Sequence, residues 1–162
     1  LAFAAPPTRR SGALDAALLQ RLLTALHLPA AAVLDHQWVD NGPGWCALRL
    51  DSAQRVLALE PDFPALEGVK LGVVGSQQAG HEAAFELRAF VGGARGYEDP
   101  VTGSLNASVA QWLMRTGQAG PAYVAAQGAA LRRAGRVYLQ REGEEVWVGG
   151  DVARRVQGDL SL

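Results

Sequence analysis

The sequence is poor in the residues that build disulfides and metal sites. Its 162 residues include one cysteine, Cys46, one methionine, Met114, and three histidines. A lone cysteine excludes an internal disulfide and favours a reducing, cytoplasmic compartment. With the histidines scattered, no metal-ligand set emerges, so we expect no metal. Cys46 lies in the apolar run WCALRL, a setting more typical of packing than of a nucleophile.

The sequence also lacks an excess of charge of either sign. Lysine and arginine number 15 against 16 for aspartate and glutamate, so no general attraction to nucleic acid or to a membrane surface is expected. No uncharged run reaches transmembrane length, and no signal-peptide pattern opens the chain. Hydrophobic residues make up 49% of the chain, which suits one globular domain over residues 1–162.

The apolar pattern predicts one amphipathic helix followed by many short strands. Ser11 is a suitable cap for a helix of about 13–26, in which leucines recur at helical spacing. The opening run 1–3 predicts an edge strand or a tail. Short apolar runs separated by glycine, proline and asparagine turns then predict strands. These lie at 32–34, 45–50, 55–60, 69–74, 84–90, 123–127, 136–140, 144–148 and 152–156.

Residues 100–114, with the sequence PVTGSLNASVAQWLM, carry no formal charge. They predict a helix of about 104–115 without a charged face. A helix that is apolar or small all round is normally enclosed by the protein. Many short strands together with one such helix predict an α+β fold, a curved antiparallel-rich sheet or barrel wrapped around a central buried helix.

The start of this helix has features of an anion-binding site. The acidic pair Glu98 and Asp99 precedes it, and Thr102 and Ser104 can cap its first amides. The exposed amides of Gly103 and Ser104 would favour a carboxylate group at the positive end of the helix. Asp99 could accept a hydrogen bond from an amine or hydroxyl of the same ligand. An ordinary capped helix start is the alternative, but it does not require an enclosed helix.

The motif EDPVTGS at 98–104, followed by a helix of small residues, resembles the second-half signature of the PhzF-like isomerases of phenazine biosynthesis, relatives of diaminopimelate epimerase. Further stretches fit the same family on both sides of the motif. They are GWCAL at 44–48, LALEPD at 57–62, AQG at 126–128, RAGRV at 133–137 and VGGDV at 148–152. The similarity extends from about residue 43 to residue 160.

The resemblance implies a protein of two similar halves, each a sheet-rich barrel around a central helix, with the active site in the cleft between them. It implies a cofactor-independent isomerase or epimerase, in which a carboxylic acid of the first half moves a proton on a small carboxylated substrate. Asp99 would then contact polar groups of the substrate. Gly103 and Ser104 would bind its carboxylate, and Thr102 would shape the turn.

The features of the family's first half are absent from this sequence, which has neither the catalytic glutamate segment nor a Cys-Gly-His-Ala-Thr helix start. Because the chain starts at Leu1 and its only methionine is Met114, we expect a fragment or processed product that corresponds to the second half. Residues 1–10 would then be a strand or linker belonging to the first half. Glu98 is the only local candidate base, and the family pattern does not give it that role. We therefore expect no catalytic residue in this chain.

The expected partners are a small carboxylated substrate and the missing amino-terminal half, in the same protein or in a separate chain. Two alternatives stay open from the sequence. The chain could be a non-catalytic carboxylate-binding or assembly domain, as a homodimer in which two copies face each other. It could also be a degenerate fragment that binds no ligand.

Overall fold

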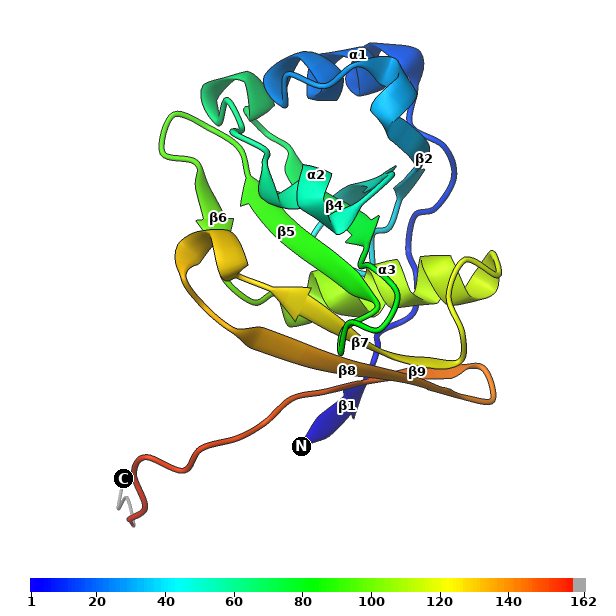
Figure 1. Ribbon diagram of the computed structural model, residues 1–162, viewed down its shortest axis with the longest axis vertical. Helices are drawn as coiled ribbons and strands as arrows, with labels where there is room; N and C mark the ends of the chain where they lie inside the picture. Colours follow the sequence, from blue (N-terminus) through cyan, green and yellow to red (C-terminus); the bar gives the residue numbers. More distant parts are fainter. Residues whose placement is uncertain (159–162) are drawn as a thin grey trace.

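A single mixed sheet organises the computed structural model, which describes residues 1–158 (Figure 1). Its nine strands are β1 (Ala2–Ala4), β2 (Val33–Trp38), β3 (Trp45–Leu50), β4 (Lys70–Ser76), β5 (Phe85–Val91), β6 (Tyr97–Asp99), β7 (Ala122–Gln127), β8 (Gly135–Glu142) and β9 (Glu145–Gly149). The strand order is β1-β9-β8-β7-β5-β4-β3-β2, and β6 pairs with β5 beside this path. The pairs β3–β4 and β5–β7 are parallel, and the other pairs are antiparallel.

The sheet curves around the helix α3 (Gly103–Arg115), which lies across its concave side (Figure 1). Small and apolar residues of α3 are buried against side chains from β3, β4, β5, β7, β8 and β9 in one core cluster. No face of the helix carries charge until Arg115, so it can be enclosed on all sides. The predicted α+β fold, an antiparallel-rich sheet around a central buried helix, is confirmed.

A second core covers the opposite face of the sheet. The helices α1 (Ala16–Ala25) and α2 (Ala53–Leu57) lie on that face, above β3, β4 and β5 (Figure 1). Alternation along β3 separates the two cores, since Ala47 faces α3 whereas Cys46 and Leu48 belong to the second cluster. Burial raises the pKa of the Cys46 thiol to about 12, which agrees with a packing role.

Several predicted elements differ from the structure. The first helix begins at Ala16, because Asp15 rather than Ser11 caps it by accepting the amide of Leu18 at 2.8 Å. Residues 55–60, predicted as a strand, form none: 55–57 are the end of α2, whose cap is Ser52, and 58–60 follow it as a turn and irregular chain. Residues 152–156, also predicted as a strand, are exposed and form no strand, since no neighbouring strand pairs with them. The short strand β6 was not predicted.

The predicted opening strand is present as β1, which pairs antiparallel with β9 of the same chain, Phe3 opposite Val148. The first and last strands of the chain, β1 and β9, therefore lie side by side at one edge of the sheet (Figure 1). From this edge residues 150–158 extend away from the body as an exposed tail.

Candidate functional site

The four residues predicted to bind a ligand come together at the amino end of α3. Asp99 ends β6, Thr102 is the residue that precedes the first turn, and Gly103 and Ser104 are the first two residues of the helix. Within residues 1–158 the amides of Gly103, Ser104 and Leu105 have no hydrogen-bond acceptor, as expected for a first helical turn. These free N–H groups and the helix dipole place partial positive charge at this end.

Thr102 does not cap the helix with its side chain, contrary to the sequence prediction. Its hydroxyl instead donates to Oδ2 of Asp99 at 2.7 Å. The carboxylate is thus held against the turn by one oxygen, while Oδ1 of Asp99 makes no hydrogen bond to any described residue. Asp99 is half-buried, so this second oxygen can accept a hydrogen bond from a ligand.

Gln127, which sequence reasoning did not assign to the site, ties the motif to the sheet. Its side chain is 1% exposed. Its Oε1 accepts from the Thr102 amide at 3.0 Å and from the Asn106 side chain at 2.7 Å. Its Nε2 donates to the Asp99 carbonyl at 2.9 Å and to the Thr102 hydroxyl at 3.1 Å. Because Nε2 occupies the acceptor side of that hydroxyl, the hydroxyl proton is directed to Asp99.

Ser104 is held by the loop between β2 and β3 and by Trp45, the first residue of β3, a second contribution that the sequence did not reveal. Trp45 Nε1 donates to the Ser104 hydroxyl oxygen at 3.1 Å, and Asn41 Nδ2 donates to the Ser104 carbonyl at 3.2 Å. Both side chains are 4% exposed. The only sequence signal for this contact is the DNGPGW turn at 40–45, which predicts a tight loop but not its partner.

Glu98, the other half of the acidic pair, does not take part in the site. It forms a bidentate ion pair with Arg88 of β5, with N–O distances of 3.0 and 2.7 Å, and both side chains are 6% exposed. The remaining guanidinium nitrogen donates to the carbonyls of Val56 and Leu59 at the end of α2. Glu98 is therefore a structural partner, and it is not available as a base.

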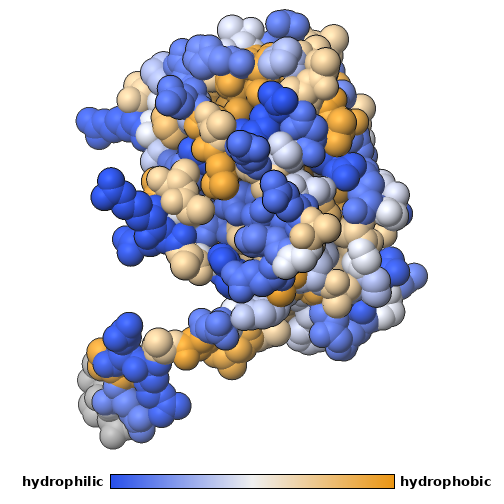
Figure 2. Space-filling model, in the orientation of Figure 1, coloured by the Kyte–Doolittle hydropathy of each residue, from blue (hydrophilic) through white to orange (hydrophobic). Residues whose placement is uncertain are grey.

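A groove of about 460 Å³ opens beside the helix end. Leu1 and Phe3 of the amino-terminal strand, Val101, Gly103 and Val152 are among its lining residues. The Phe3 ring lies 3.4 Å from where a Cβ on Gly103 would stand, so this side of the turn is covered by an aromatic ring. Four of these residues are exposed: Leu1, Phe3, Val101 and Val152. Figure 2 shows hydrophobic surface where the body of the molecule meets the carboxy-terminal tail.

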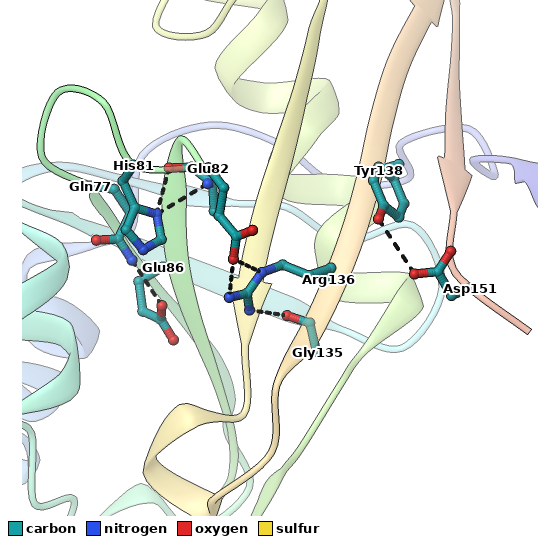
Figure 3. A network of polar contacts seen from close by, with 9 residues as sticks. Gln77, His81, Glu82, Glu86, Gly135, Arg136, Tyr138 and Asp151 are labelled. Atoms are coloured by element: carbon teal, nitrogen blue, oxygen red, sulfur yellow. Dashed lines mark hydrogen bonds and ion pairs between the residues drawn. The ribbon is translucent and has the colours of Figure 1, made fainter.

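A separate polar network lies on the face of the sheet that points away from α3 (Figure 3). Glu86 of β5 is 2% exposed, and its Oε2 accepts from Gln77 Nε2 at 3.1 Å, whereas its Oε1 is buried without a partner. Arg136 of β8 binds the exposed Glu82 instead, at 2.8 Å from its Nε. Loss of hydration on burial raises the pKa of Glu86, despite the nearby positive charge of Arg136.

In the part of the chain that the structure describes, no cluster of three or more His, Cys, Asp or Glu side chains is arranged to hold a metal ion. No helix within residues 1–158 has the length and apolar character needed to span a bilayer.

Comparison with known proteins identifies relatives over nearly the whole chain. A family model described as phenazine biosynthesis-like protein, PhzC-PhzF, matches residues 2–158. An uncharacterised isomerase of Pseudomonas aeruginosa is 34% identical over 114 residues, which are 70% of this chain and 42% of that protein.

Solved structures share the fold. A PhzF-family phenazine biosynthesis protein from Bacillus anthracis matches with a TM-score of 0.70 at 15% identity, over 92% of this chain and 56% of its own. A PhzF-family protein from Enterococcus faecalis gives 0.66 at 23% identity, over 93% of this chain and 52% of its own. A predicted epimerase from Pseudomonas aeruginosa gives 0.67 at 22% identity, over 92% of this chain and 54% of its own. The chain thus spans about half the length of these relatives.

Proposed function

The chain belongs to the family of phenazine biosynthesis-like proteins, and from this premise we propose that it is the substrate-binding half of a cofactor-independent isomerase or epimerase. In this proposal the chain corresponds to the second half of a two-domain protein. The isomerase and epimerase named among its relatives support a reaction of this class. The share of those relatives that the chain spans, about half, supports the assignment to one half.

One juxtaposition carries the proposal. The free amides of Gly103 and Ser104 lie at the same helix end as Asp99, one carboxylate oxygen of which accepts no hydrogen bond from residues 1–158. The amides are donors suited to a substrate carboxylate, and Asp99 is an acceptor suited to an amine or hydroxyl. The pair therefore fits a small molecule that carries a carboxylate and a hydrogen-bond donor a few ångströms apart.

The helix end would also assist the chemistry. Removing a proton from a carbon conjugated with a carboxylate spreads negative charge onto the carboxylate oxygens. Preorganised amides and a helix dipole stabilise such charge without having to reorient. The group that takes the proton needs a suitable pKa and a position at the reacting carbon. Glu98 is held by Arg88, so we assign proton transfer to a carboxylic acid outside this chain.

The test is to combine the chain with the first-half domain of a relative and to follow solvent deuterium entering small carboxylated substrates. We expect exchange with the combined protein and none with either half. Asp99→Asn and Ser104→Ala should each lower the exchange rate by about tenfold or more, because the first removes a charged acceptor and the second removes the hydroxyl at the helix end. Absence of exchange across a panel of carboxylated substrates, with a stable complex present, contradicts the proposal.

A second candidate function is a non-catalytic carboxylate-binding domain that assembles as a homodimer. The exposed apolar groove beside the helix end favours it, because such a surface is suited to burial against a second copy. Sedimentation of the chain alone, together with calorimetric titration by small carboxylates, separates the candidates. A tight dimer that binds benzoate without a first half supports this second function.

A further inference from the structure

The hydroxyl of Ser104 is fixed by a buried indole. Trp45 Nε1 lies 3.1 Å from Ser104 Oγ, and Trp45 is 4% exposed. Ser104 Oγ is the only hydrogen-bond acceptor of this indole within residues 1–158. A buried N–H without a partner is costly, so the contact is expected to persist in solution.

The loop that leads into Trp45, the first residue of β3, is closed by its own hydrogen bonds. Asp40 Oδ1 accepts the amides of Gly42 and Gly44 at 2.7 and 2.6 Å, which closes the loop on one carboxylate. The Asp40 carbonyl accepts the amide of Arg9 at 2.7 Å, so the amino-terminal segment braces the loop from outside. Asn41 then fixes the Ser104 carbonyl at 3.2 Å. The loop therefore holds the main chain of Ser104, and Trp45 at the start of β3 holds its hydroxyl.

The direction of the proton follows from the chemistry of the two groups. An indole N–H can only donate, whereas a serine hydroxyl both donates and accepts. Because Trp45 occupies an acceptor position on Ser104 Oγ, the hydroxyl proton must be given to another group. No described residue accepts it. The hydroxyl is consequently left as a donor at the same helix end as the free amides of Gly103 and Ser104.

We propose that Trp45 is a positioning residue that sets the Ser104 hydroxyl as a donor, so that the helix end selects an ionised carboxylate over a neutral amide or ester. This inference rests on the proposed function, in which the helix end binds the substrate carboxylate. A carboxylate only accepts hydrogen bonds, so it matches a site composed of N–H and O–H donors. A carboxamide offers one oxygen and an NH₂ donor, which opposes the donors of the site.

The experiment uses the full chain labelled with ¹⁵N, which gives one indole signal for each of its four tryptophans. Trp45→Phe assigns the Trp45 signal and removes the donor while keeping an aromatic ring in the core. Ser104→Ala should shift the Trp45 indole signal strongly, because it removes the acceptor. Titration with benzoate and with benzamide into the millimolar range then gives the affinity ratio of carboxylate to amide.

We expect Trp45→Phe to lower the benzoate-to-benzamide affinity ratio by roughly threefold to tenfold, the range for one typical hydrogen bond. A merely structural role would weaken both ligands together and leave the ratio unchanged. Trp147→Phe is the matched control, since the buried indole N–H of Trp147, in β9, has no hydrogen-bond partner among residues 1–158. It should leave the ratio as in the wild type.

The outcomes separate the inference from the proposed function. Benzoate binding with a ratio that Trp45→Phe does not change overturns the inference alone. A Trp45 indole signal that ignores Ser104→Ala also overturns it, because the contact is then not made in solution. Absence of benzoate binding by the wild-type chain overturns both the inference and carboxylate recognition at this helix end.

Discussion

At the scale of single residues, the site depends on which donor and acceptor positions of each hydroxyl and carboxylate are already occupied. Gln127 occupies the acceptor side of the Thr102 hydroxyl, and that hydroxyl then occupies Oδ2 of Asp99. Trp45 likewise occupies an acceptor position of the Ser104 hydroxyl, whose proton is then available for another group. In both cases an amide or indole buried in the core fixes the direction in which a surface group can act. The ligand-facing groups are therefore ordered before any ligand arrives.

Thr102→Val tests this ordering. Valine keeps the shape of threonine but leaves Asp99 Oδ2 without its donor and Gln127 Nε2 with one acceptor fewer. We expect the free energy of unfolding to fall by about 1–3 kcal/mol, the usual result of losing a buried hydrogen bond. Urea denaturation measures it. Thr24→Val is the control, because the exposed Thr24 hydroxyl donates only to the Gln20 carbonyl of its own helix; an equal loss in both variants contradicts the prediction.

Glu86 predicts a pH dependence of stability. Burial raises its pKa in the folded chain above the ordinary value of 4.5, so the folded state favours the protonated form. The stabilisation by that proton is complete below the unfolded pKa and is lost as the pH rises through the folded pKa. Glu86→Gln mimics the protonated form. The melting temperature of the variant should therefore exceed that of the wild type increasingly as the pH rises above about 4.5.

Glu82→Gln is the matched control for this titration. Glu82 lies in the same network (Figure 3), but its hydrogen bond to Arg136 lowers its pKa. The ionised form is then favoured by folding, so stability from Glu82 is lost as the pH falls through its folded pKa. Both variants should therefore approach the wild type at low pH and depart from it as the pH rises, Glu86→Gln towards higher stability and Glu82→Gln towards lower stability. A Glu86→Gln variant that parallels the wild type between pH 4 and pH 8 rules the assignment out.

The sequence led to Asp99, Thr102, Gly103 and Ser104 because they are contiguous with a distinctive helix. It did not lead to Gln127, Trp45 or Arg88, although these residues determine what the first four can do. Their contacts depend on register. Leu87 pairs with Gln127 across the parallel strands β5 and β7, and Phe90 pairs with Glu98 across β5 and β6. Such pairings join residues distant in sequence, and local patterns carry no information about them.

At the scale of elements, the predicted strands were correct where a neighbouring strand exists. The run 55–60 has strand-like composition, but Ser52 caps the amide of Arg55 at 3.2 Å and starts α2 instead. The run 152–156 begins and ends with valine, yet it lies beyond the last pairing of β9. The composition of a segment thus indicates that it can form a strand. Whether it does so depends on a neighbouring strand with which it can pair.

Gly128, at the turn after β7, tests how tightly the motif is packed against the sheet. Its φ is +96°, and a Cβ there would lie 2.6 Å from the carbonyl oxygen of Pro100, within the site motif. Gly128→Ala combines backbone strain with this collision. We expect it to destabilise the chain by about 3 kcal/mol or more and to weaken benzoate binding, because the Pro100 turn must move. Chemical denaturation and the benzoate titration measure the two effects.

Gly117→Ala separates strain from collision. Gly117 has a φ of +71°, but a Cβ there would meet no atom within 4 Å. Its replacement should therefore destabilise by only about 1–2 kcal/mol and leave benzoate binding unchanged. Equal effects of the two substitutions would mean that the contact between Gly128 and Pro100 does not constrain the motif.

At the scale of the whole molecule, one face of the sheet is covered by helices, whereas the edge beside the amino end of α3 exposes apolar residues. The second core is covered by α1 and α2, whereas the groove beside the amino end of α3 leaves Leu1, Phe3 and Val101 exposed. The fold itself could be predicted from the sequence, because an uncharged helix among short strands has few arrangements. The exposed groove at this edge could not be predicted from the sequence, because it depends on where β1 and the tail lie relative to the amino end of α3.

The open edge predicts where a first-half domain binds. Adding that domain should protect amides of residues 1–4, 100–105 and 149–152 from hydrogen–deuterium exchange, because these segments border the groove and the helix end. Residues 16–25 of α1 should exchange as before, since α1 lies on the opposite face of the sheet. Mass spectrometry of peptides resolves the regions. Protection of α1 in place of the groove would contradict the predicted arrangement. Protection of the groove that grows with the concentration of the chain alone would instead identify a second copy as its occupant.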